Sequence, residues 1–142
     1  MLIPHLHFCD NCEEAIAIYE KAFHTKAESI VYNRDYACIV DDHDYTPSEY
    51  PADNRIAHAV MNIHGQKVFL NDRFGNKDKS LNCAVHIIVM FKSVEELLAC
   101  YEFFKEESTI IDPFTKLPYS ELAGSFIDKF GVQWGFMIEA KS

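Results

Sequence analysis

A repeated helical segment constrains the fold of this chain more than any other feature. The segment 11–20 (NCEEAIAIYE) matches the segment 93–102 (SVEELLACYE), 82 positions later. Five residues are identical in the two copies: Glu13/Glu95, Glu14/Glu96, Ala17/Ala99, Tyr19/Tyr101 and Glu20/Glu102. Asn11 with Glu14, and Ser93 with Glu96, have the spacing of a capping box at a helix start. The chain therefore reads as a duplicated unit that contains one helix.

A second pair of segments supports the duplication. Residues 64–70 (HGQKVFL) match 130–136 (FGVQWGF) with Gly65 aligned to Gly131, 66 positions apart. The two offsets differ by 16 residues, and the polar segment 41–54, which contains two prolines, supplies an insertion of about that length. In the second copy, apolar residues alternate along 132–138 after a turn at Gly131, which predicts a hairpin with one buried face.

The apolar pattern predicts the same order of elements in both halves. In the first half we expect a strand at 2–9, a helix at 12–23, and hairpins at 28–32/36–40 and 56–63/67–72. In the second we expect a strand at 82–91, a helix from 93 to about 107, strands at 109–115 and 119–126, and a closing strand at 132–138. This order predicts an α+β fold: two βαβββ modules forming curved mixed sheets around a cleft, with helices on the outer faces.

Composition bounds the organisation and the partners. With 142 residues, 49% of them hydrophobic, we expect a single domain 1–142 made of module one 1–72, a linker 73–80 and module two 81–142. The net charge of −9 disfavours nucleic acid and anionic membranes as partners. There is no signal-peptide pattern and no apolar run of about 18 residues, so we expect a soluble cytoplasmic protein. The odd number of cysteines, 5, favours reduced thiols.

Several short motifs resemble the vicinal oxygen chelate superfamily, which includes glyoxalase I, bleomycin-resistance proteins and extradiol dioxygenases. The first is Pro4-x-Leu6-x-Phe8 before the Asn-Cys-Glu-Glu-Ala helix. Asp128-x-Phe-Gly-Val-x-Trp134 and His58-Ala-x-Met-x-Ile63 are similar to its PhnB-like branch, often labelled 3-demethylubiquinone methyltransferase-like. The resemblance covers nearly the whole chain. It implies the two-module fold and a homodimer, but fold alone does not determine function.

The resemblance also implies where a metal would be held. Metal-dependent members use His, Glu or Gln on the first and last strand of each module. With the helices in register, these positions fall on Pro4, His86 and Gly135, and on a fourth near 69–71 with Asp72 as the nearest carboxylate. Only His86 is a clear ligand, whereas a catalytic divalent ion usually needs three protein ligands. We therefore expect no metal or other cofactor, with His86 as the ligand if a divalent metal is bound.

Other candidate residues have both a functional and a structural interpretation. His5 and His7 share a strand face with Cys9, so they predict either a His-x-His metal site, with His58 as a third member, or partly buried side chains. Cys9 and Cys12 have the spacing of a zinc knuckle, but no second pair completes it. Cys12 at a helix start is either a thiol of lowered pKa or an ordinary free thiol.

The strand alternation predicts the lining of the cleft. If Gly135 faces the cleft, Trp134 belongs to the core under the helix. His58 and His86 are either cleft residues, acting as ligand contacts or as a general base, or hydrogen-bonded core histidines. Ile88 also faces the cleft, opposite the last strand. The predicted ligand-binding residues are His58, His86, Leu6, Phe8, Met90, Gln133 and Met137.

Two functions follow from this lining. An apolar, Met-rich cleft suits a metal-free protein that binds an apolar or cationic organic molecule. The alternative is a divalent-metal-dependent lyase or isomerase that uses His86. A methyltransferase is disfavoured because the chain has no Gly-rich loop after a first strand. For the segment 41–54, with Tyr45 and Tyr50, the length is typical of a functional loop over the cleft or the dimer seam and equally of a disordered one, and the sequence does not choose between them.

Overall fold

The structure is a computed structural model that describes residues 1–36, 54–72 and 85–139. The chain divides into two compact units, Met1–Lys77 and Asp78–Ser142, which we call module one and module two. The predicted linker 73–80 and the inserted segment 41–54 lie almost wholly outside the described residues. Each module is considered by itself.

Module one is a four-stranded sheet with one long helix. Its elements are β1 (His5–Phe8), α1 (Cys12–Ala22), β2 (Ser29–Tyr32), α2 (Asn33–Tyr36), β3 (Ile56–Ile63) and β4 (Gln66–Asp72). The strand order is β1-β4-β3-β2, with β1 parallel to β4 and the other pairs antiparallel. The apolar side of α1 is buried as predicted, and the Phe8 ring of β1 lies 6.3 Å from the ring of Tyr19.

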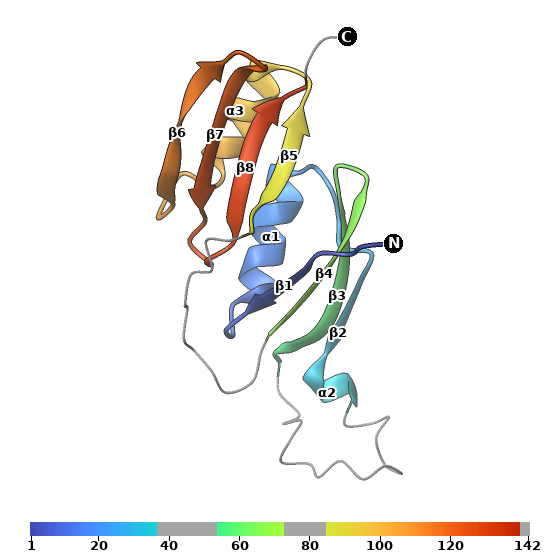
Figure 1. The fold of residues 1–142 in the computed structure, drawn as a ribbon. Coiled ribbons are helices and arrows are strands. Elements are labelled where there is room, and N and C mark those ends of the chain that lie inside the picture. The colour runs from blue at the N-terminus through green and yellow to red at the C-terminus, as the bar shows by residue number, and fades with distance from the viewer. Residues whose placement is uncertain (37–53, 73–84, 140–142) are drawn as a thin grey trace. The chain divides into compact units, whose positions relative to one another are not determined.

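Module two repeats this architecture (Figure 1). Its elements are β5 (Ile87–Phe91), α3 (Val94–Glu102), β6 (Thr109–Leu117), β7 (Ser120–Ile127) and β8 (Gln133–Ile138), in the sheet order β5-β8-β7-β6. β5 is parallel to β8, and the remaining pairs are antiparallel. The predicted α+β fold of two βαβββ modules with mixed sheets is confirmed.

The pairing registers make the duplication residue-specific. His5 pairs with Phe69 in module one, and Ile88 pairs with Gly135 in module two. Phe69 in turn pairs with Val60, as Gly135 pairs with Ser125. Phe69 and Gly135 are therefore counterparts, and so are His5 and Ile88. The first strands of the two modules, β1 and β5, are thus offset by 83 positions, whereas the two helices are offset by 82.

Trp134 belongs to the core, as predicted. It is 1% exposed, and its ring centroid lies 5.8 Å from that of Phe104. Because successive residues of a strand face opposite sides of the sheet, Gly135 lies on the face away from this core.

Two predicted elements are wrong. The hairpin 28–32/36–40 is not formed in its described part, because β2 pairs with β3 and Asn33–Tyr36 is a short helix. Asp35 Oδ2 accepts a hydrogen bond from Tyr32 N at 2.9 Å, a local side-chain bond that competes with strand extension. The second helix ends at Glu102 rather than near Glu107, whose φ of 60° is incompatible with a right-handed helix.

The two helix starts differ. Ser93 caps α3 as predicted, since its side chain accepts from Glu96 N. Asn11 makes no such bond to α1, and its side chain accepts from Cys9 N instead. The first turn of α1 is held by Asp72 at the end of β4, whose Oδ1 accepts from Cys12 N at 3.0 Å. A residue distant in sequence has replaced the local cap.

The described helices are all too short or too polar to cross a membrane.

Candidate functional site

The face of the module-two sheet opposite the core carries a concave site, which we call the hollow. Its volume is about 470 Å³, within the range of small-molecule sites. Strands β5, β6, β7 and β8 all contribute to it. The lining residues are His86, Ile88, Asp112, Pro113, Thr115, Leu117, Tyr119, Ala123, Gly124, Ser125, Gly135, Phe136 and Met137.

Gly135 creates space at the floor of the hollow. A Cβ placed on it would lie 2.6 Å from Cδ1 of Ile88 and 3.5 Å from Nε2 of His86. The neighbouring side chains therefore lean over a position that any other residue would fill. His86, just before β5, and Gly135 of β8 thus both line the hollow, and ligand contact by His86 stays a prediction.

A polar pair stands on the neighbouring strands. Ser125 Oγ donates a hydrogen bond to Asp112 Oδ2 at 2.6 Å, and the two residues pair across β7 and β6. Ser125 is 3% exposed, whereas Asp112 is exposed. The arrangement presents a carboxylate to the hollow while its partner hydroxyl is buried beneath it.

Sequence reasoning missed both members of this pair. Ser125 could have been predicted, because counting five positions in each direction from Phe130, at the centre of the β7–β8 turn, places Ser125 opposite Gly135. Asp112 could not, because the β6–β7 register shifts on both sides of it. A strand with such irregularities loses the strict alternation from which a side chain's face is predicted.

The predicted ligand-binding residues fall into three groups. His86 and Met137 line the hollow. Met90 pairs with Met137 and is 38% exposed. Gln133 is the first residue of β8. Neither Met90 nor Gln133 lines the hollow.

The third group lies in module one. Leu6 and Phe8 are 9% and 1% exposed, and Phe8 packs against Tyr19 of α1. They therefore belong to the core rather than to an open face, because β1 turns this side toward the helix. His58 lies on the opposite, open face of module one. Ligand contact by any of the predicted residues stays a prediction.

The open face of module one carries a cluster of rings. His5 and His7 lie side by side with centroids 4.3 Å apart, and His58 is 6.4 Å from His5. His58 makes an edge contact of 4.7 Å with Phe69, and His7 Nδ1 is 2.6 Å from Asn71 Oδ1. Within residues 1–36, 54–72 and 85–139, no group of three His, Cys, Asp or Glu residues could hold a metal ion.

Comparison with known proteins agrees with the two-module architecture. The family model of the Glyoxalase/Bleomycin resistance protein/Dioxygenase superfamily matches residues 2–136. The chain belongs to this superfamily. Among curated proteins, YjdN of Escherichia coli K12 is 26% identical over 139 residues, covering 94% of this chain and 91% of YjdN.

Several solved structures share the fold. The PhnB protein from Bacillus cereus is 22% identical with a TM-score of 0.76, covering 96% of this chain and 98% of its own. PA1353 from Pseudomonas aeruginosa is 19% identical with a TM-score of 0.77, covering 99% and 98%. The predicted membership of the superfamily is confirmed, and a PhnB protein is among the structures that share the fold.

The metal positions of the superfamily can now be followed on the strand registers. The positions that the resemblance implies fall on Phe69 and Gly135 in the last strands and on His86 just before β5. The counterpart of His86 in module one is Ile3 by the offset of 83 or Pro4 by the helix offset. Asp72 is not available, because it is 5% exposed and its two oxygens accept from Cys12 N and Ile56 N. One imidazole among these positions does not fit a divalent ion that needs three protein ligands.

Two of the described cysteines, Cys12 and Cys100, are buried free thiols. Burial, with the charges of Asp72 and Glu13, raises the pKa of the Cys12 thiol, so the suggested lowering by the helix start is wrong. Burial likewise raises the pKa of Cys100 to about 12. Both thiols stay protonated and poorly nucleophilic at neutral pH.

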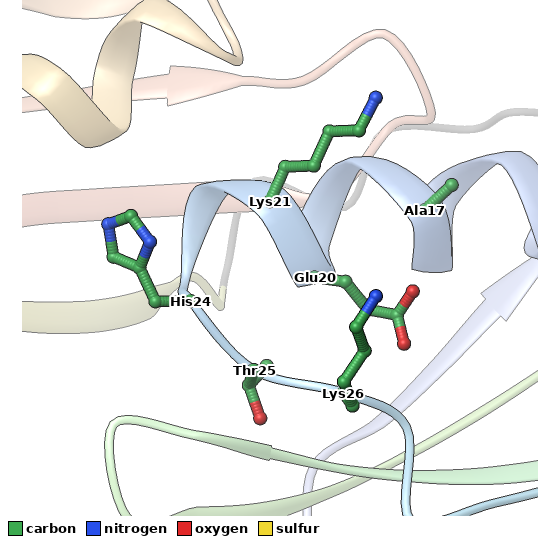
Figure 2. Close-up of a pocket in the computed structure, with 6 residues that line it drawn as sticks. All are labelled: Ala17, Glu20, Lys21, His24, Thr25 and Lys26. Atoms are coloured by element: carbon green, nitrogen blue, oxygen red, sulfur yellow. The ribbon is translucent and has the colours of Figure 1, made fainter.

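A second cavity lies in module one, and the polar side chains that line it do not converge on one point. It has a volume of about 520 Å³ and is lined by Ala17, Glu20, Lys21, His24, Thr25 and Lys26 around the end of α1 (Figure 2). Figure 2 shows the side chains of Lys21 and His24 pointing in different directions. The carboxylate of Glu20 accepts from Ala27 N at 2.8 Å, which closes the turn after the helix. The hollow of module two is the better candidate site.

Proposed function

We propose that this chain binds a small organic molecule, apolar or cationic, in the hollow of module two, without a bound metal. The observation that carries this proposal is the hollow itself, with its mostly apolar wall and its glycine floor. Ile88, Leu117 and Met137 offer apolar surface, and Ser125 and Asp112 supply the few oriented polar groups typical of ligand sites.

The donor set of the hollow supports binding without a metal. Of the two ligand positions that the resemblance implies in module two, His86 before β5 has an imidazole, and Gly135 of β8 has no side chain. The metal-dependent lyase or isomerase would need further ligands, and no observation on the described residues favours it. A homodimer and a cytoplasmic location stay predictions.

Calorimetry with naphthylmethylamine and naphthylmethanol tests the proposal. We expect saturable binding of at least one probe to wild-type protein. Ala123→Phe, on the wall of the hollow, is expected to weaken it about tenfold or more, because the added ring occupies the ligand's volume. Ala17→Phe, the same substitution at the module-one cavity, is the matched control and should leave binding unchanged.

Three outcomes would contradict the proposal. One is no binding of either probe to folded wild-type protein. Another is binding that Ala17→Phe abolishes and Ala123→Phe leaves intact. The third is binding that requires an added divalent ion. Thr115→Phe, at an exposed position on the wall of the hollow, provides a second block should Ala123→Phe fail to fold, since aromatic residues are favoured in strands.

A further inference from the structure

We infer that Asp112 makes the hollow selective for organic cations, with a protonated amine as the preferred group. This inference rests on the proposed function, because it assigns the chemistry of the ligand that the hollow takes.

The first support is that the Asp112 carboxylate is oriented and can still accept hydrogen bonds. Ser125 Oγ donates to Oδ2 at 2.6 Å and orients the group. A carboxylate has about four lone-pair sites, so one hydroxyl leaves acceptor capacity for a ligand. Because Ser125 is buried and Asp112 is exposed, the remaining capacity is on the accessible member of the pair.

The second support is the charge around the hollow. No Lys or Arg is among its lining residues, and His86 is its one basic side chain. Within the described residues, Asp112 forms no ion pair; Asp10 pairs with Arg55, and Glu102 with Lys105. No Lys or Arg of the described residues therefore neutralises the negative charge of Asp112, and the net charge of −9 also attracts cations.

The third support is the apolar surface beside the carboxylate. Ile88, Met137 and Leu117 line the same hollow as Asp112. An ammonium group bound at Asp112 can thus be attached to an apolar body that covers these side chains. A molecule with a phosphate or carboxylate group would instead be repelled.

The two naphthyl probes separate this inference from the proposed function. They have the same ring system, but the amine is charged at neutral pH and the alcohol is not. We expect the amine to bind wild-type protein about tenfold more tightly than the alcohol, since charge-assisted hydrogen bonds exceed neutral ones by that order. Added salt should weaken binding of the amine and leave that of the alcohol unchanged.

Substitution of the carboxylate completes the test. Asp112→Asn retains an acceptor for Ser125 and removes the charge, so the two probes should then bind with similar affinity. Glu106→Gln removes one exposed carboxylate of module two away from the hollow and should preserve the preference.

Equal, salt-independent affinities for both probes, each weakened by Ala123→Phe, would overturn the inference while the proposed function stands. A preference that survives Asp112→Asn would also overturn it. Failure of both probes to bind would overturn the proposed function, and the inference with it.

Discussion

The indole Nε1 of Trp134 donates a hydrogen bond to Oδ2 of Asp128 over 2.9 Å. The other oxygen of this carboxylate accepts from the backbone N–H groups of Phe130 and Val132, at 2.9 and 3.0 Å. Asp128 is 4% exposed, and the turn that it closes contains Gly131 at a φ of 93°. One buried carboxylate thus joins the β7–β8 turn to the largest side chain of the core.

We expect Asp128→Asn to destabilise module two. The amide has one acceptor oxygen in place of two, so at least one of three buried donors loses its partner, at a cost of about 1–3 kcal/mol. Urea unfolding followed by tryptophan fluorescence measures the loss, because Trp134 is the single tryptophan. Glu106→Gln, on an exposed carboxylate of the same module, should change the free energy of unfolding by less than about 0.5 kcal/mol. Equal stabilities of Asp128→Asn and Glu106→Gln would show that the carboxylate bonds contribute little.

Asp72 has the corresponding structural role in module one. Its oxygens accept from Cys12 N at 3.0 Å and from Ile56 N at 2.9 Å, so it connects the start of α1 to the start of β3. We expect Asp72→Ala to lower the free energy of unfolding by about 2 kcal/mol or more, since both buried donors lose their acceptor. Chemical denaturation followed by far-UV circular dichroism measures it. Asn11→Ala should cost clearly less; a larger loss there would restore Asn11 as the cap.

Alkaline pH should destabilise the protein through Cys100. Burial raises the pKa of this thiol from 9.0 to about 12, so the unfolded chain ionises first. The contribution of Cys100 to the free energy of unfolding is complete below about pH 9 and is lost as pH rises toward about 12. At pH ~10 the loss is about 1 kcal/mol. Urea unfolding at pH ~8 and pH ~10 should show a smaller decline for Cys100→Ala than for wild type. Cys9→Ala, at a half-buried position, serves as the control. Identical declines in all three proteins would contradict this assignment.

Divalent metals should not stabilise the protein. With His86 as the one clear ligand among the superfamily positions, we expect less than about a tenth of an equivalent of Zn²⁺, Ni²⁺ or Mn²⁺ after purification without chelators. Elemental analysis and thermal melts with and without EDTA provide the measurement. Stoichiometric metal that disappears in His86→Ala, together with a melting point lowered by EDTA, would favour the lyase or isomerase alternative.

Local patterns in the sequence were sufficient for several structural features. The duplicated helix, the hairpin 56–63/67–72, the Ser93 cap and the buried Trp134 each depend on neighbours a few positions away. Periodicity and turn chemistry report such neighbours directly. The superfamily resemblance named both His86 and Gly135, and both line the hollow.

The features that failed depend on contacts between distant residues. Leu6 and Phe8 were expected to line a cleft, but strand alternation does not say which side a helix covers.

The sequence by itself determined that two copies of one βαβββ unit make up this chain, because periodicity and repetition are properties of a linear pattern. Only the tertiary structure decided that Asp72 caps α1 from 60 positions away and that Asp112 joins Ser125 in the hollow. A buried donor takes whichever acceptor the fold brings within hydrogen-bond distance, and a shifted strand register moves a side chain between faces. The Asp72 cap and the Asp112–Ser125 pair both depend on contacts between residues that are distant in sequence, which a local sequence pattern does not contain.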